Sequence, residues 1–360
     1  MGVRISAPNP GRHKAGAENT LLYCLGPFLH QYQPDGYKQL SGTISVKIAE
    51  VFYTASRRDG DWTLTSTFDA AKRVIAAANM SLFFDPYLSA DKNFRRAALD
   101  YPDEVFKTAG FLIPLPQFMR SIITALWPKN TGQASHIMIT RLRSVIENRL
   151  KLGSALADAP GRSKTTRDYL QYIIDSTIDY GHLTTEDIVL TVLMTWLIAV
   201  HETAVIGTHA LENLCKYPDY AELIRSEVIA IHTLGELGDS YGHDSDLNPS
   251  KLDQCPVLDA FLKETCRLAP PNAITMQRKA RSAITFKDGT RILPGDLACV
   301  PSQAIMRDEN FYQDSMSFFP RRFLDHGSQF SPLSRNLRFT GTENTYPLWG
   351  LGKHAWYVTS

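Results

Sequence analysis

Apolar residues recur every three or four positions through much of the chain between residues 68 and 230, which is the period of an amphipathic helix. The pattern is clearest in FDAAKRVIAAANMSLFF, from Phe68 to Phe84, and in SHIMITRLRSVIENRLKL, from Ser135 to Leu152. Proline and glycine residues separate such segments, as they do between helices. The pattern predicts a large helical part of the protein.

A longer apolar segment begins at Leu183 and meets no proline until Pro218. It predicts a central helix of about 30 residues, against a usual mean of about 11 to 12. Its uncharged run, from Ile188 to Val200, is 13 residues long, whereas a bilayer span takes roughly 18 or more. We therefore expect a buried helix.

In the last third of the chain the predicted elements are no longer helices alone. LDAFLKETCRLAPP, from Leu258 to Pro271, predicts an amphipathic helix that two prolines end. Alternating residues on both sides of Asp288-Gly289 then indicate a β-hairpin. A coil rich in aromatic residues and arginine follows from Arg307 to Asn336, and so long a loop normally has a function. The expected class is mainly α with a small β region.

Composition narrows the class of protein only slightly. The 360 residues are 44% hydrophobic and carry a net charge of +1, which fits a globular protein and argues against nucleic acid as the main partner. Five scattered cysteines without CxxC spacing favour neither a disulfide framework nor a zinc site. With no linker or repeat, we expect one domain over residues 1–360. Residues 1–61 show no assignable pattern, and their first part, from Met1 to Thr20, has no apolar core suited to a signal peptide or membrane anchor.

Glu264 and Arg267, three apart in KETCR, lie on one face of the predicted helix. Most such pairs are solvated and contribute little to stability. Arg322, in FFPRRF, can complete a carboxylate with two guanidinium groups, because its planar fork makes paired hydrogen bonds. The alternative is a solvated basic patch with Arg321.

Glu202 and Thr203 stand in AVHETA, within the long apolar helix. A buried acid beside a hydroxyl is costly unless it is hydrogen-bonded, so the pair suggests a proton relay or a locally unwound turn. The alternative is a helical turn that emerges into solvent near His201 and His209.

The stretch WGLGKHAW, from Trp349 to Trp356, has the form of a cofactor loop. Gly350 and Gly352 flank a tight turn, Lys353 and His354 supply cationic groups, and Trp356 stands where a metal ligand is expected.

Taken in order, the acid-alcohol helix, the ExxR helix, the hairpin, the FFPRRF coil and the WGLGKHA loop resemble a cytochrome P450. The resemblance covers roughly Trp62 to Ala355 and is stronger in the C-terminal half. It implies a P450-like fold, a haem b cofactor and electrons from NADPH-cytochrome P450 reductase. The loop and the stretch from Asn93 to Pro128 resemble fungal P450s of secondary metabolism, which implies a lipophilic substrate such as a terpenoid or polyketide.

The resemblance also implies roles for single residues. Glu264, Arg267 and Arg322 would lock the coil near the haem. Glu202 and Thr203 would deliver protons for oxygen activation. The remaining cofactor-binding residues would be those of the loop and one arginine of the hairpin, where the cations meet the haem propionates: Arg278, Gly350, Gly352, Lys353 and His354.

Trp356 departs from the family, whose members have a cysteine there as the thiolate ligand of iron. An indole offers a donor and no available lone pair, so the sequence predicts an inactive chain. His354 can ligate iron in principle but stands two residues early.

Two readings of this departure stay open. The first is a fragment of a monooxygenase, cut at both ends, in which Trp356 comes from an unspliced intron: a cysteine codon split after TG by an intron beginning with GT would be read as TGG. The second is a haem-free pseudoenzyme that acts as a binding or scaffolding module. A coincidental likeness in an unrelated helical protein is a third, weaker reading. P450s are usually anchored in the endoplasmic reticulum membrane, and the sequence leaves localisation undecided.

Overall fold

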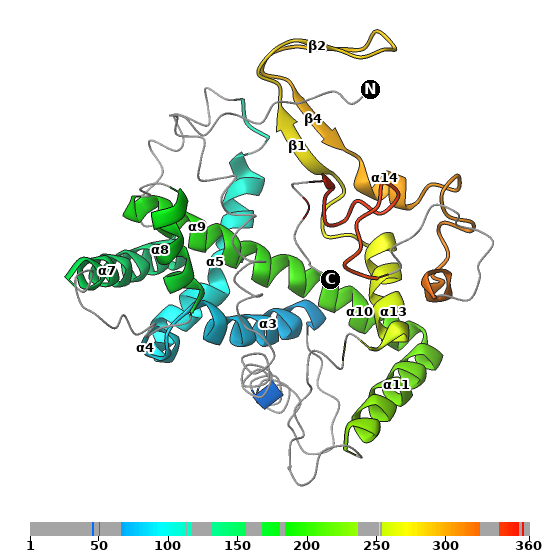
Figure 1. Cartoon of the computed structure of the whole chain (residues 1–360), viewed down its shortest axis with the longest axis horizontal. Helices are drawn as coiled ribbons and strands as arrows, with labels where there is room; N and C mark the ends of the chain where they lie inside the picture. Colours follow the sequence, from blue (N-terminus) through cyan, green and yellow to red (C-terminus); the bar gives the residue numbers. More distant parts are fainter. Residues whose placement is uncertain are drawn as a thin grey trace. The chain divides into compact units, whose positions relative to one another are not determined.

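The computed structural model describes eight stretches of the chain, 45–46, 66–112, 114–116, 132–155, 168–180, 184–236, 254–324 and 338–352, and the single residues 50, 252 and 355. Helices dominate them, with two small antiparallel sheets (Figure 1). The chain divides into two compact units: Met1–Gln31 with Ala76–His201, and Tyr32–Ile75 with Glu202–Ser360. The two are described separately below, and the single domain expected from the sequence stays a prediction.

The first unit is built from helices alone within its described residues. They are the C-terminal part of α3 (Thr67–Phe83), α4 (Pro86–Ala90), α5 (Lys92–Leu112), α7 (Gln133–Ala155), α8 (Tyr169–Tyr180) and α9 (Thr185–Leu197). The two helices predicted most clearly from the apolar period are α3 and α7.

Aromatic side chains fill the core of this unit. The rings of Phe83 and Trp196 meet edge to face at 5.3 Å between centroids, and those of Phe84 and Phe94 at 5.0 Å. The buried indole Nε1 of Trp196 donates to the Ala98 carbonyl at 2.9 Å. A buried tryptophan needs such a partner for its N–H group, so this bond fixes α9 against α5.

The long helix predicted from Leu183 is present and begins with a capping box between Thr184 and Asp187. It runs as α9, a π-helical turn η1 (Ile198–Glu202) and α10 (Thr203–Lys216). Asn79 donates to the Ala199 carbonyl at 3.0 Å within the turn. The helix is thus locally widened at the acid-alcohol pair, and such π-turns are frequent at functional sites.

By length and composition, the segment Thr185–Lys216 is apolar enough to cross a membrane, but 56% of its most apolar window is buried inside the protein. The core helix of a globular protein has the same properties.

The second unit combines helices with a β-ribbon. Its described elements are α10, α11 (Pro218–Glu236), α13 (Pro256–Leu268), β1 (Thr275–Lys279), β2 (Ile284–Thr285), β3 (Arg291–Ile292), β4 (Leu297–Val300), α14 (Ser302–Met306) and the 3-10 turn η2 (Pro320–Phe323). α13 is the predicted ExxR helix, with a proline at its start and the Pro270-Pro271 pair beyond its end.

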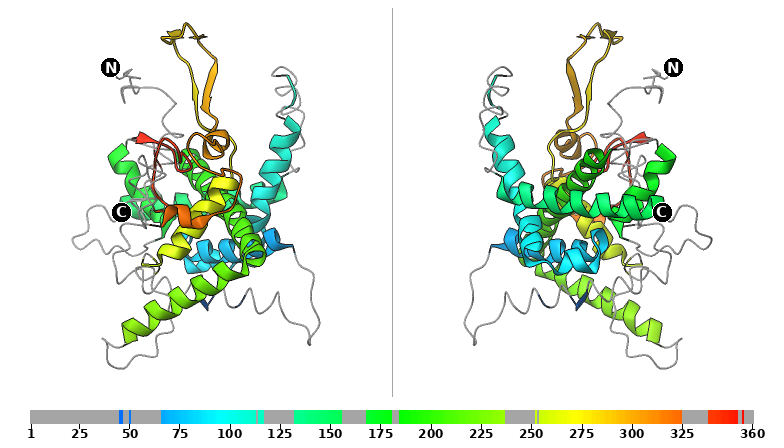
Figure 2. Two further views of the ribbon diagram at one scale, coloured as in Figure 1. Left: turned by 90° about the vertical axis from the view of Figure 1, so that its right-hand side faces the viewer. Right: turned by 90° about the vertical axis from the view of Figure 1, so that its left-hand side faces the viewer.

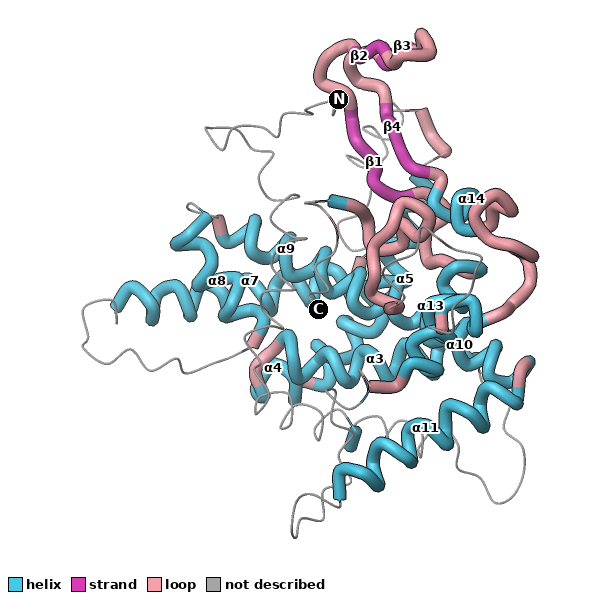
Figure 3. The backbone as a smooth tube through the Cα atoms, turned by 45° about the vertical axis from the view of Figure 1, so that its right-hand side comes forward, coloured by secondary structure: helices cyan, strands magenta, loops and turns pink. Residues whose placement is uncertain are grey.

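β1 and β4 form an antiparallel ribbon, with Thr275 opposite Val300 and Lys279 opposite Leu297. β2 and β3 form a second small sheet at the far end of the same ribbon (Figures 2 and 3). Gly289, in the turn between them, has a φ of 85°, a conformation that side chains disfavour. The hairpin predicted around Asp288-Gly289 is therefore present.

Candidate functional site

Glu264 and Arg267 form a buried ion pair on α13. Arg267 donates twice to the carboxylate, from Nε at 2.7 Å and from Nη2 at 2.9 Å. Both side chains are 0% exposed. A bidentate arginine-carboxylate pair is a strong form of hydrogen bonding. The sequence left open a solvated surface pair, and the structure shows a buried one.

A second arginine and a backbone amide complete the same carboxylate. Arg322 Nε lies 3.1 Å from Glu264 Oε1, and the Phe319 amide donates to that oxygen at 2.8 Å. Pro320 begins η2, the short turn that carries Arg322 back toward α13. The structure thus brings Glu264, Arg267 and Arg322 together into what we call the Glu264 cluster.

The two arginines of the Glu264 cluster also hold the coil that follows α14. Arg267 Nη1 donates to the carbonyls of Met306 and Ser315, at 2.7 and 2.6 Å, and Arg322 Nη1 donates to that of Gln313 at 2.9 Å. Carbonyls without a helix or strand partner are costly to bury. The guanidinium groups satisfy them, so an irregular chain can pack against α13.

Lys263, next to the Glu264 cluster on α13, was missed from the sequence. Its buried ammonium lies 4.8 Å from the ring centres of both Phe323 and Tyr346. Burial lowers the pKa of Lys263 to about 8, although Glu343 and Asp259 oppose the shift. No pattern in the sequence marks it, because Asp259 and Arg267, one turn away on either side, are also charged.

The segment that leads into the WGLGKHA loop is anchored to α13. The Phe339 amide donates to Asp259 Oδ2 at 2.6 Å, and the Tyr346 hydroxyl donates to the Lys263 carbonyl at 3.3 Å. Trp349 Nε1 donates to the Phe339 carbonyl at 2.8 Å. These bonds place the start of the loop beside the helix that carries the Glu264 cluster.

Glu202 is the last residue of the π-turn and is half-buried. Burial raises the pKa of its carboxyl, while a hydrogen bond from Asn272 Nδ2, 2.9 Å from Glu202 Oε1, acts in the opposite direction. The Thr203 side chain is exposed. Asn272 was also missed from the sequence, because it lies 70 residues from its partner.

The structure describes three of the other residues predicted to bind the cofactor. Gly350 and Gly352 have φ angles of 78° and 65°, as expected for the tight turn. Arg278 is exposed, and its guanidinium donates to the Gln277 carbonyl at 2.8 Å. Lys353, His354 and Trp356 lie outside the described residues.

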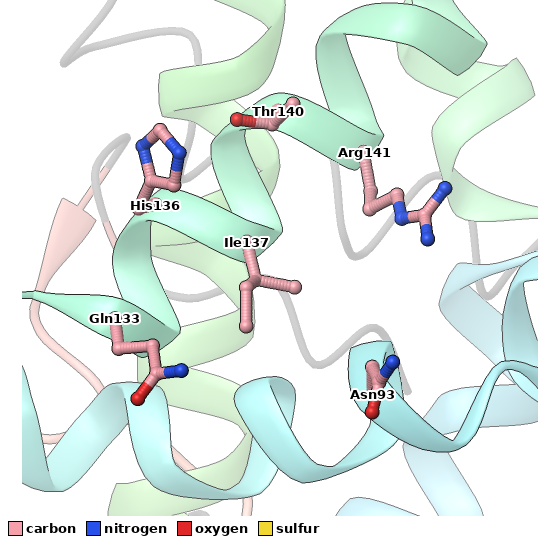
Figure 4. Close-up of a pocket in the computed structure, with 6 residues that line it drawn as sticks. All are labelled: Asn93, Gln133, His136, Ile137, Thr140 and Arg141. Atoms are coloured by element: carbon pink, nitrogen blue, oxygen red, sulfur yellow. The ribbon is translucent and has the colours of Figure 1, made fainter.

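A surface hollow of about 380 Å³ lies between α5 and α7 of the first unit (Figure 4). It is lined by Asn93, Gln133, His136, Ile137, Thr140 and Arg141. None of these is a site residue predicted from the sequence. Most of them are exposed, so the hollow offers no enclosed site.

The donor groups do not fit a haem held by thiolate. The described cysteines are Cys215, Cys255, Cys266 and Cys299, and none lies in the loop. Cys266 is fully buried on α13, where burial raises the pKa of its thiol and so disfavours a thiolate. Among the described residues no cluster of three histidine, cysteine or acidic side chains can hold a metal ion.

Comparisons with known proteins agree with this architecture. The sequence profile described as Cytochrome P450 matches residues 46–339, ending before the loop. Cytochrome P450 monooxygenase 110 of Postia placenta is 24% identical over 314 residues, or 87% of this chain and 59% of the relative. Cytochrome P450 monooxygenase pyr3 of Aspergillus fumigatus is 28% identical over 325 residues, or 87% of this chain and 58% of the relative.

A solved structure, a retinoic acid bound cyanobacterial CYP120A1, shares the fold with a TM-score of 0.64 at 18% identity, over 94% of this chain and 66% of its own. The predicted mainly α, P450-like fold is confirmed. This chain spans somewhat less than three-fifths of the two curated relatives. The profile match shows that the chain belongs to the cytochrome P450 family.

Proposed function

We propose that this chain carries the framework of a fungal haem-thiolate monooxygenase but does not perform the oxidation itself, because Trp356 stands at the position of the iron ligand. The observation that carries the proposal is the complete, buried Glu264 cluster in a chain whose loop lacks a thiol. The framework is assembled, and the group that would bind iron is missing.

The reaction of the corresponding active protein is the insertion of one oxygen atom into a lipophilic small molecule. The curated relatives support this reaction class, since they are fungal cytochrome P450 monooxygenases. We infer a terpenoid or polyketide of secondary metabolism as substrate and NADPH-cytochrome P450 reductase as the source of electrons. Haem b, when bound, would supply the oxygen-activating chemistry.

Glu202 and Thr203 are the proposed proton-handling pair. Burial favours the protonated form of Glu202, so its carboxyl can hold a proton nearer neutral pH than a solvated glutamate can. The adjacent Thr203 hydroxyl is exposed and can both accept and donate a proton. The pair can therefore pass a proton from solvent into the widened turn.

Restoring the ligand tests this proposal. The chain with Trp356→Cys, reconstituted with haem and reduced under carbon monoxide, should show the red-shifted band of thiolate-ligated haem, whereas the unchanged chain should not. Ala355→Cys is the matched control, since it supplies a thiol one residue away and should give no such band. A thiolate band in the unchanged chain would contradict the proposed inactivity. No haem uptake by a folded Trp356→Cys variant would contradict the framework.

The second candidate is a haem-free binding or scaffolding protein. It is favoured by the hydrogen bonds of Asp259 and Lys263 with the segment leading to the loop, because they hold that segment against α13. Sequencing the spliced messenger across the codon for Trp356 separates the candidates. A cysteine codon supports the monooxygenase, and a retained tryptophan codon supports the haem-free protein.

A further inference from the structure

The hydrogen bond between Asn272 and Glu202 joins two segments of the second unit that are distant in sequence. Asn272 Nδ2 donates to Glu202 Oε1 at 2.9 Å. Glu202 ends the π-turn, and Asn272 follows the Pro270-Pro271 pair beyond α13. The contact therefore links the acid of the acid-alcohol pair to the helix of the Glu264 cluster.

The backbone around Asn272 is held on both sides. The two prolines before it have restricted φ angles, and the Ala269 amide closes the end of α13 on Thr265 at 2.9 Å. The carbonyl of Ala273 accepts from the Gln303 amide at 3.1 Å. The backbone that carries the Asn272 amide is therefore held close to Glu202.

The position of Glu202 is also set independently of this bond. α10 follows directly from the π-turn, and Asn213 on α10 donates to Thr265 Oγ1 on α13 at 3.2 Å. This bond connects α10 to α13 at a point other than the Asn272 contact. The Asn272 amide meets a carboxyl whose backbone is already placed, so its effect falls on the carboxyl orientation.

An amide suits either protonation state of its partner. Its N–H group donates to a carboxylate oxygen, and its carbonyl can accept from a protonated carboxyl. With one oxygen of Glu202 held by Asn272, the other oxygen is left to exchange the proton.

The titratable and charged groups near Glu202 along its helix have other partners. The His201 ring packs against that of Phe106 in a tilted arrangement, with 4.1 Å between centroids, and His209 Nδ1 lies 3.2 Å from Glu212 Oε2. On the segment after α13, Arg278 bonds to the backbone of Gln277. Burial raises the pKa of Glu202, and the Asn272 amide opposes this shift.

We propose that Asn272 is a positioning residue of this site, which holds the Glu202 carboxyl in one orientation at the end of the π-turn. The inference rests on the proposed function, in which Glu202 carries the proton. It adds a residue that belongs neither to the cofactor loop nor to the Glu264 cluster.

Infrared titration of the full chain tests the proposal without haem. The carboxylic C=O band that disappears in Glu202→Gln belongs to Glu202. In Asn272→Leu, which loses the donor at similar volume, its titration midpoint should move to higher pH and the band should broaden. In Asn272→Asp a second carboxyl faces Glu202, and the pair should titrate in two separate steps. Asn272→Gln keeps an amide donor, so its titration midpoint should lie between those of the wild type and Asn272→Leu.

Asn213→Leu is the matched control, since it removes an asparagine bond between α10 and α13 that does not involve Glu202. It should leave the midpoint unchanged. An unchanged midpoint in both Asn272→Leu and Asn272→Asp would overturn the proposal, as would an equal shift in Asn213→Leu. The titration needs no haem, so failure of Trp356→Cys to bind haem would refute the proposed framework and leave this result standing.

Discussion

Each unit of the protein contains an arginine-carboxylate cluster, buried in the second unit and partly buried in the first, and the two clusters have opposite stoichiometry. In the second unit, one carboxylate, Glu264, takes two guanidinium groups. In the first unit, one guanidinium, that of Arg149, takes two carboxylates. Arg149 binds Asp168 through two contacts of 2.7 Å and Asp85 through a third of 2.7 Å.

The two clusters hold different kinds of structure. Asp85 caps α4 by accepting from the Leu88 amide at 2.7 Å, and Asp168 accepts from the Gln171 amide at the start of α8, also at 2.7 Å. Arg149 thus ties two helix N-termini to α7. The Glu264 cluster instead holds an irregular coil through its carbonyls. A buried ion cluster therefore serves as a joint between regular elements in one unit and as support for a loop in the other.

Removing the shared carboxylate should have the largest effect. Glu264→Gln leaves two arginines without their counter-charge, and we expect it to lower the free energy of unfolding by about 3–5 kcal/mol in urea titrations. Arg96→Gln, which breaks the pair with Asp100 at 87% and 56% side-chain exposure, is the control and should cost less than about 1 kcal/mol. Equal losses of unfolding free energy in the two variants would show that burial of the Glu264 cluster adds nothing to its effect on stability.

Removing the shared guanidinium should have a somewhat smaller effect. Arg149→Met leaves the carboxylates of Asp168 and Asp85 facing each other, and we expect a loss of about 2–4 kcal/mol. The loss is smaller than for Glu264 because the Asp85 side chain is 21% exposed and stays partly hydrated. Arg149→Lys should recover only part of the lost stability, since an ammonium cannot make the paired hydrogen bonds that a guanidinium makes with a carboxylate.

Hydrogen exchange locates that loss. Amides of α4 and α8 should lose protection in Arg149→Met, while those of α13 keep theirs. Equal loss of protection in α13 would show that the comparison between two separate joints is wrong.

Lys263 sharpens the comparison, because it is a buried cation beside the Glu264 cluster whose ammonium lies close to two aromatic rings. Its pKa is about 8 in the folded protein and 10.5 ordinarily. Between these values the unfolded chain binds more protons, so this group makes stability rise with pH across that window. Below pH 8 both states are protonated, and the cost of burying the charge is fully present.

Lys263→Met should therefore stabilise the protein at pH 7 by about 1–2 kcal/mol, after allowance for the lost contacts with Phe323 and Tyr346. The variant should also show a smaller rise in stability than the wild type between pH 8 and pH 9.5. Urea midpoints at pH 7 and pH 9.5 measure both effects. A less stable variant at pH 7 would show that the cation–π contacts outweigh the cost of burial.

Much of the architecture could be predicted from local patterns. The long helix followed from its apolar run and lack of proline, and the hairpin from Asp288-Gly289. The Glu264 cluster could be anticipated because Glu264 and Arg267 are one helical turn apart and a proline-arginine-phenylalanine pattern marks Arg322. At Glu202 the sequence left a proton relay, a locally unwound turn and a turn emerging into solvent as alternatives, and the structure has a π-helical turn there.

Asn272, Lys263 and the Arg149 cluster were not predictable in the same way. Asp85, Arg149 and Asp168 lie 64 and 19 residues apart and belong to no repeating pattern. Each is an ordinary polar residue by itself, and only the packing of α4, α7 and α8 makes them partners.

By itself the sequence determined where helices and turns begin and end, the order of the P450-like motifs, and the chemistry missing at Trp356. These properties depend on residue type and on spacing within one or two turns. Tertiary structure alone decided which polar groups meet and how deeply they are buried. The free energy of an ion pair and the pKa of an acid or a lysine depend on distance and on exclusion of water, and folding sets both between segments that the chain keeps far apart.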